Sequence, residues 1–236
     1  MDVLADIWDQ VTSRQPVPEA SFVLAAGLVA LLLVLLPATW LRARLGVTVV
    51  HEAGHALVAV LVGRRLSSIR LHSDTSGLTV SRGKPRGPGM VAMLAAGYLA
   101  PALLGLLAAF LLADGRGVAL LWLLLLLLAG LLVWVRNGYG LLVVLVGGGA
   151  VFALTWWGSD QVQAVAAYLV AWLLLLAAPR PLLQLLASGR RRRRTSDPDQ
   201  LADLTHVPAV VWMLVLLAAS CAGLFVGVGM LAPELV

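Results

Sequence analysis

The stretch GVTVVHEAGHALVAVLVG, residues 46–63, is almost entirely apolar, yet it holds two histidines and one glutamate. A helix of this length is about 27 Å long, close to the thickness of the hydrocarbon core of a bilayer. Arg44 and Arg64, which flank the stretch, can extend their side chains towards the two membrane interfaces. The stretch therefore predicts a membrane-spanning helix with ionisable side chains inside it.

The whole chain has the composition of an integral membrane protein. Of its 236 residues, 61% are apolar and only 12% are charged, and the mean hydropathy is +0.95. Seven apolar runs are each long enough to span a bilayer as a helix, at about residues 21–41, 46–63, 90–113, 117–135, 140–158, 162–179 and 207–232. We therefore predict an all-α polytopic membrane protein with about seven transmembrane helices.

The segment before the first apolar run, residues 1–20, carries four acidic residues and one arginine. This charge is wrong for a secretory leader, so we expect no cleaved signal peptide. Its apolar residues have the spacing of a helix that lies on the membrane surface; they are Val3, Leu4, Ile7, Trp8 and Val11. We expect residues 21–236 to form a single membrane-embedded domain.

The polar loop at residues 64–88 contains the pattern of a β-hairpin. Ile69 and Leu71, and then Leu78 and Val80, alternate with polar residues on the two sides of a turn-forming segment. The edge of such a hairpin can pair with an extended peptide, whereas a solvated loop is an equally good interpretation of the same residues. We predict a small β-hairpin-like cytoplasmic loop.

The distribution of positive charge predicts the orientation, because lysine and arginine tend to remain on the cytoplasmic side of a membrane. With seven spans, most of the 17 basic residues lie on one set of loops: Arg14, Arg64, Arg65, Arg70, Arg82, Lys84, Arg86, Arg136, Arg180 and Arg190 to Arg194. The other set holds Arg42, Arg44 and Arg116. We therefore place the N-terminus in the cytoplasm and the C-terminus outside, in a multi-pass protein of the cell membrane.

The loop at residues 180–206 is basic, because it contains the run Arg190 to Arg194. In a soluble protein such a run would suggest nucleic acid as a partner. Here it directly follows an apolar run, and anionic lipid headgroups explain it better. We expect the lipid bilayer, and no nucleic acid, to contact the basic loops.

The motif His51-Glu52-Ala53-Gly54-His55 has the form H-E-x-x-H. On a helix, His51 and His55 share a face and can reach one metal ion, while Glu52 lies close enough to take a proton from a water molecule. Ionisable side chains inside a bilayer are costly and usually functional. A zinc-dependent hydrolase within the membrane is the leading hypothesis; the alternative is that these side chains only form hydrogen bonds between helices.

Two histidines make an incomplete site, because a catalytic zinc usually has three protein ligands and one exchangeable water. Glu52 is the only acidic residue inside a predicted span. The third ligand must therefore come from a loop or a helix end on the side of the membrane to which His55 is closer. The candidates there are His72, Asp74, Asp197, Asp199, Asp203 and His206.

Several further motifs accompany the histidine motif. They are the polar stretch at residues 64–87, AAGYLAP at 95–101, RNGYG at 136–140, and Ser196-Asp197 followed by Leu201-Ala202, Leu204-Thr205, Pro208 and Trp212. Together these residues resemble the site-2-protease-like intramembrane zinc metallopeptidases, and more closely their short bacterial branch without a PDZ domain. The resemblance covers roughly residues 45–215, and only the histidine motif is specific by itself.

This resemblance implies a protease that cuts membrane-spanning proteins within or near the bilayer. Carried over to this chain, it implies that His51 and His55 bind Zn²⁺ and that Glu52 is the general base. The aspartate ligand would be Asp197, in the matching Ser-Asp element, since the Leu-Asp-Gly motif of well-studied members is absent. The amide of Asn137 would hold the substrate backbone or the oxyanion; a simple helix N-cap is the alternative.

Two other functions fit parts of the pattern. A transporter or channel would use the histidines and Glu52 as an ion path, but it would need further ionisable residues in neighbouring spans, and the sequence has none there. A zinc-binding membrane scaffold of the same family, with weak or no catalytic activity, would keep the whole motif. We therefore predict a zinc-dependent metalloendopeptidase with transmembrane protein substrates, and keep the silent scaffold as the alternative.

Overall fold

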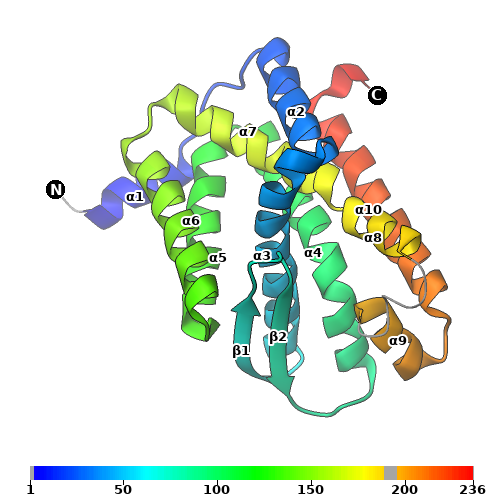
Figure 1. Ribbon diagram of the computed structural model, residues 1–236. Helices are drawn as coiled ribbons and strands as arrows, with labels where there is room; N and C mark the ends of the chain where they lie inside the picture. Colours follow the sequence, from blue (N-terminus) through cyan, green and yellow to red (C-terminus); the bar gives the residue numbers. More distant parts are fainter. Residues whose placement is uncertain (1–2, 189–195, 236) are drawn as a thin grey trace.

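Helices make up most of residues 3–188 and 196–235, the part of the chain that the computed structural model describes (Figure 1). In chain order the elements are α1 (Val3–Thr12), α2 (Ala20–Leu35), α3 (Pro37–Leu61), β1 (Arg65–Leu71), β2 (Gly77–Arg82), α4 (Pro88–Ala113), α5 (Gly117–Trp134), α6 (Gly138–Trp157), α7 (Asp160–Ala177), α8 (Arg180–Ala187), α9 (Asp197–Thr205), α10 (Ala209–Leu231) and η2 (Pro233–Leu235). The basic run Arg190 to Arg194 lies outside the described residues.

Within the described part of the chain, 6 helical segments are long and apolar enough to cross a membrane. They are α3, α4, α5, α6, α10 and the segment Asp160–Ala187, which comprises α7 and α8. A further apolar helix, α2, is shorter. The structure confirms the predicted all-α polytopic membrane class with a small hairpin, although the first two predicted spans divide at a different place.

A single residue, Leu36, separates α2 from α3. Pro37 has no N–H and cannot continue the hydrogen bonds of α2. The hydroxyl of Thr39 lies 3.1 Å from the Leu33 carbonyl oxygen that the proline leaves without its helical partner. The junction is therefore a break within one long helical path, and the loop predicted between residues 41 and 46 does not exist.

Charged residues at the helix ends correct the predicted topology. Nη2 of Arg14 lies 2.6 Å from Oδ1 of Asp114, and Nε of Arg116 lies 2.7 Å from Oδ2 of the same carboxyl group. Arg14 and Arg116 thus lie at the same end of the helices, and the prediction that puts them on opposite sides of the membrane is wrong. The error arises at the α2–α3 junction, because Arg42 and Arg44 lie within α3 and not on a loop between two antiparallel spans.

The strands β1 and β2 pair in antiparallel fashion, which confirms the hairpin predicted for this loop. The hairpin folds back along α3, because the Thr48 hydroxyl donates a hydrogen bond of 2.8 Å to the Thr75 carbonyl oxygen in the turn (Figure 1). Ile69 and Leu71 on β1 are each 1% exposed, whereas Leu78 on β2 is 50% exposed. The sheet therefore packs on the helices mainly through β1, and one face of β2 remains accessible.

Two apolar clusters hold the elements around α3. One joins α3, β1, α5 and α6 and includes Val49, Ile69 and Val144. The other joins α4, α8, α9 and α10 through buried leucines: Leu94, Leu182, Leu201 and Leu216. The second cluster attaches the short helix α9 to the bundle and so determines where its first residue lies.

Candidate metal centre

Helices α3 and α4 approach each other closely where the histidine motif lies. At Gly54 a Cβ atom would lie 2.8 Å from the Ala96 carbonyl oxygen, which leaves no room for a side chain. At Gly97 on α4, a Cβ atom would collide with the ring of His55 and would lie 2.7 Å from the Cε1 atom of His51. The two glycines thus let both imidazoles lie in the contact between the helices.

The ring of His55 has a defined orientation. Its Nδ1 atom lies 2.7 Å from the backbone carbonyl oxygen of Met93, and because a carbonyl oxygen can only accept, Nδ1 carries the hydrogen. The Nε2 atom then faces the Nε2 atom of His51 at 3.0 Å. A carbonyl that fixes the far nitrogen in this way is typical of metal-binding histidines.

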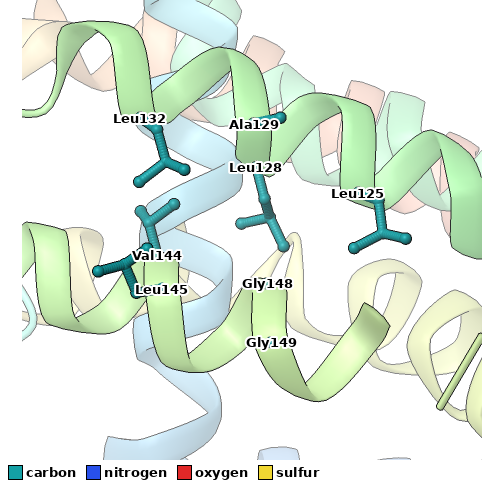
Figure 2. Close-up of a pocket in the computed structure, with 8 residues that line it drawn as sticks. All are labelled: Leu125, Leu128, Ala129, Leu132, Val144, Leu145, Gly148 and Gly149. Atoms are coloured by element: carbon teal, nitrogen blue, oxygen red, sulfur yellow. The ribbon is translucent and has the colours of Figure 1, made fainter. Parts of the chain in front are cut away.

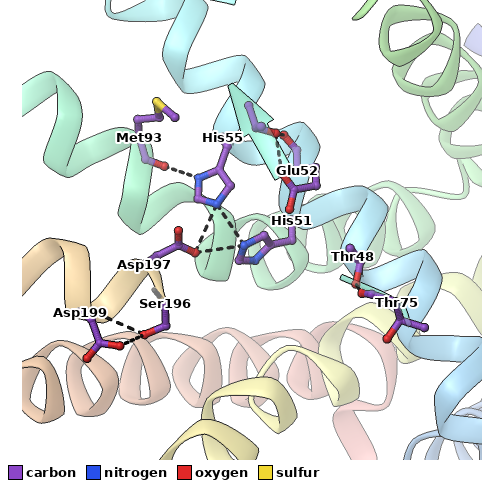
Figure 3. A network of polar contacts seen from close by, with 10 residues as sticks. Thr48, His51, Glu52, His55, Thr75, Met93, Ser196, Asp197 and Asp199 are labelled. Carbon is purple, nitrogen blue, oxygen red and sulfur yellow. Dashed lines mark hydrogen bonds and ion pairs between the residues drawn. The ribbon is translucent and has the colours of Figure 1, made fainter. Parts of the chain in front are cut away.

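Asp197, the first residue of α9, completes a group of three side chains that could bind a metal ion. Its Oδ2 atom lies 3.2 Å from Nε2 of His51 and 3.3 Å from Nε2 of His55 (Figure 3). Tetrahedral zinc with bonds of about 2.0–2.1 Å separates its ligand atoms by about 3.3 Å. The spacing suits one zinc ion, and within the described residues this is the only group of three or more side chains placed to hold a metal.

The position of Asp197 depends on how α9 begins. The Ser196 hydroxyl donates a hydrogen bond of 2.6 Å to Asp199 Oδ2 and accepts one of 3.4 Å from the Asp199 N–H, so it caps the helix. Burial raises the pKa of the Asp197 carboxyl, but its close contacts with the imidazoles of His51 and His55 outweigh burial and hold that pKa below its ordinary value. The two imidazoles thus favour the carboxylate, the form in which aspartate binds a metal.

The structure does not bring the other candidate ligands to this group. Asp74 accepts hydrogen bonds of 2.6 and 2.9 Å from the hydroxyl and N–H of Ser76, and these bonds lower its pKa. His72 lies 3.3 Å from the same hydroxyl, and His206 ends α9 in the left-handed conformation. No metal-binding group in the described part of the chain includes these side chains, nor Asp199 or Asp203.

Glu52 is buried next to the group of three but is not part of it, and only 4% of it is exposed. Its Oε2 atom accepts a hydrogen bond of 2.5 Å from the Thr79 hydroxyl on β2. Gly77 on the same strand lies so close that a Cβ atom there would collide with the carboxyl group. Neither contact was predicted from the sequence; the alternation of Gly77 and Thr79 on one face of β2 was the available signal.

Two residues of α4 complete the surroundings of the histidines and were also not predicted. Met93 acts through its backbone carbonyl, which no side-chain pattern reveals. The ring of Tyr98 meets His51 edge to face, with 4.8 Å between the ring centroids. Tyr98 belongs to the AAGYLAP motif, but the motif does not predict the contact with His51.

A comparison with protein families matches this chain to a known group. The chain matches the Peptidase M50B-like family over residues 24–227, which include His51, Glu52, His55 and Asp197. The chain belongs to the M50B-like peptidases. This is the site-2-protease family of membrane metallopeptidases, so the resemblance inferred from the sequence is confirmed. A comparison with curated proteins gives no match, and neither does a comparison with solved structures.

In this M50B-like peptidase, Asn137 binds the sheet. Its Nδ2 donates a hydrogen bond of 2.6 Å to the Leu71 carbonyl oxygen, and its Oδ1 accepts one of 3.2 Å from the Leu71 N–H. Beside it, the Arg136 N–H donates a bond of 3.0 Å to the Ile69 carbonyl oxygen. Asn137 precedes α6 but makes no side-chain capping bond. Residues 135–137 therefore support the outer edge of β1, and contact between Asn137 and substrate stays a prediction.

The M50B-like peptidase also has an apolar groove of about 180 Å³ between α5 and α6 (Figure 2). Its lining consists of Leu125, Leu128, Ala129, Leu132, Val144, Leu145, Gly148 and Gly149. None of these residues can ionise or bind a metal through its side chain. The groove therefore offers no metal-binding side chain, and the one metal-binding group in the described residues lies on α3 and α9.

Proposed function

We propose that this M50B-like peptidase is an intramembrane zinc metalloprotease that hydrolyses peptide bonds in membrane-spanning proteins. The main support is that ligand atoms of His51, His55 and Asp197 lie within 4.8 Å of one another, with Glu52 buried beside them. The helices that surround them are long and apolar enough to lie in a bilayer. We also propose that residues 21–236 act as one membrane-embedded domain.

The donor set suits zinc, since two imidazole nitrogens and one carboxylate oxygen are typical of catalytic zinc sites. Zn²⁺ bound there would polarise the scissile carbonyl group and make the attacking water more acidic. His51, His55 and Asp197 would hold the ion. Met93 would assist by keeping the Nδ1 hydrogen of His55 directed away from it.

Glu52 acts as the general base in this proposal. It accepts a proton from the water that attacks the carbonyl carbon, and it donates this proton to the leaving amine nitrogen when the C–N bond breaks. Its burial keeps bulk water away from both steps. The position of Glu52 directly after His51 on α3 puts base and ligand in one rigid element.

The hairpin receives the substrate. A membrane-spanning substrate is helical, and its carbonyl groups must leave their helical hydrogen bonds before they can be attacked. In the described residues the sheet has no strand beyond β2, and Leu78 and Val80 are exposed there. An unwound segment that pairs with β2 would lie next to Thr79 and therefore close to Glu52. Asn137 supports this role by holding β1.

The orientation that fits these roles places the hairpin and Arg136 at the cytoplasmic end of a cell-membrane protein, because most of the basic residues in the described part of the chain lie there. The contact between Arg14 and Asp114 then puts the N-terminal segment at the outer end. The C-terminus lies at that end too, as Figure 1 shows for α10 and η2. Cysteine labelling from each side of the membrane tests this arrangement.

The variant Glu52→Gln tests the proposed function. Glutamine keeps the shape of the side chain but cannot accept the proton, so we expect cleavage of a membrane-spanning reporter to fall about 100-fold or more. Zinc content, measured by mass spectrometry on the purified protein, should remain near that of the wild type. Glu19→Gln is the matched control, since Glu19 is exposed before α2 and makes no side-chain capping bond.

Other results of the zinc and cleavage measurements would lead to different conclusions. A wild-type protein without zinc, or a Glu52→Gln variant that cleaves at the wild-type rate, would contradict the proposal. A wild-type protein that binds zinc and cleaves no membrane-spanning reporter would favour the silent scaffold.

A further inference from the structure

The inward face of β2 touches the carboxyl group of Glu52 at two places. The Thr79 hydroxyl donates a hydrogen bond of 2.5 Å to Oε2 and also lies 3.3 Å from the backbone carbonyl oxygen of Glu52. Two residues earlier on the same face, Gly77 approaches Oε1 so closely that no side chain would fit between them. One strand thus determines where both carboxyl oxygens lie.

Such contacts matter because Glu52 is long and buried. A glutamate side chain rotates about three bonds, and a buried carboxyl group has little water to bind, so its direction depends on protein partners. Within the described residues, Thr79 provides the one hydrogen bond that this carboxyl group accepts. With Oε2 held by the hydroxyl, Oε1 is the oxygen that remains to accept a proton.

We propose that Thr79 is a positioning residue for Glu52, and that its hydroxyl keeps Oε1 directed at the attacking water. The inference rests on the proposed function, because it gives Thr79 a part in the same reaction. The hydroxyl remains a donor to Oε2 while Oε1 gains and loses the proton, so Thr79 itself exchanges none. Since Thr79 lies on β2, a substrate segment that pairs with β2 also steadies the base as it enters.

A purely structural role for Thr79 would give different results. Thr79 is half-buried in the middle of β2, so its methyl group and backbone also stabilise the hairpin. Valine keeps the size, the branching and the strand preference of threonine and removes only the hydroxyl. Serine keeps the hydroxyl and removes the methyl group. The two variants therefore separate the hydrogen bond from the packing.

The kinetic test uses the zinc-loaded full chain in lipid vesicles with a membrane-spanning reporter peptide. We expect Thr79→Val to lower kcat about 10- to 100-fold with KM and zinc content unchanged, and Thr79→Ser to keep most of the wild-type rate. The matched control, Thr155→Val, removes a buried hydroxyl that bonds to the Val151 carbonyl oxygen within α6. It should keep the wild-type rate. If Thr79→Val does not fold, Thr79→Ala provides a second variant without the hydroxyl.

Infrared spectra provide a readout that depends on neither cleavage nor metal. The carboxyl band of Glu52, identified by its loss in Glu52→Gln, should shift in Thr79→Val and keep its position in Thr79→Ser. An unshifted band, equal kcat values for wild type and Thr79→Val, or a Thr79→Ser variant as slow as Thr79→Val would each overturn the inference. If the wild type cleaves nothing, the proposed function fails, and the infrared band still decides whether Thr79 orients Glu52.

Discussion

The contact between α3 and α4 and the groove between α5 and α6 both contain glycine, but glycine has a different effect in each. Gly54 and Gly97 lie against backbone atoms and imidazole rings, and a Cβ atom at either would overlap its neighbours. Gly147, Gly148 and Gly149 have no atom within 4 Å of a Cβ atom built on them. Small residues in a membrane helix therefore do not by themselves indicate a close contact between helices. Such a contact exists only where another element lies against them.

The largest difference is expected between a valine at Gly97 and a valine at Gly148. Gly97→Val should reduce zinc affinity about 100-fold or more, because the added side chain would displace the rings of His51 and His55. Gly148→Val should leave it unchanged, since a Cβ atom there meets no neighbour and the groove lies away from the metal-binding side chains. Titration with zinc and a competing chelator measures both. Equal affinities for the two variants would show that the difference between the regions has no functional meaning.

A smaller effect is expected where the close contact involves the base and not the ligands. Gly77→Ala should lower kcat about 10-fold, because its methyl group would push the Glu52 carboxyl group out of place. Zinc affinity should stay at the wild-type value. Gly149→Ala adds the same methyl group in the open groove and should change neither quantity. Loss of zinc from Gly77→Ala would mean that β2 supports the ligands as well as Glu52.

The smallest effect is expected from the helix that supplies the third ligand. Ser196→Ala removes the cap of α9 and should weaken zinc binding about three- to fivefold, as expected for a lost cap of about 1 kcal/mol. Ser159→Ala removes the corresponding cap of α7, where the hydroxyl accepts from Val162 at 3.5 Å, and should not affect zinc. The same titration applies. A zinc affinity unchanged in Ser196→Ala would indicate that packing through Leu201 alone holds α9.

The parts of the molecule that sequence could predict depend on local information. Apolar runs of sufficient length predict the helices, and a spacing of four residues puts His51 and His55 on one face whatever else the chain does. Alternation likewise predicted β1 and β2. The break at Leu36 also has a local signal, because a residue before proline rarely stays helical. The charges of Arg42 and Arg44 instead favour a loop at residues 42–45, and that prediction is wrong because both arginines lie within α3.

The remaining parts depend on contacts between distant segments. Composition and charge left several candidates for the third ligand, and only the family resemblance favoured Asp197. Its place beside His51 depends on how Leu201 packs against α4, α8 and α10, which no pattern within α9 reveals. The same holds for Thr79, whose importance depends on which face of the hairpin meets α3. The fold was therefore more predictable than the completed site.

The pairing of the N-terminal segment with the α4–α5 region has a consequence for how the protein is made. Arg14 pairs with Asp114, 100 positions later, and Gln10 accepts a hydrogen bond of 3.3 Å from the Trp122 indole N–H. At about 5–20 residues per second, a ribosome needs about 5–20 s to synthesise the intervening chain. During that interval Arg14 and Gln10 cannot make these two contacts. These two contacts therefore form only after the chain has been synthesised as far as Asp114 and Trp122, so they are a late step of folding.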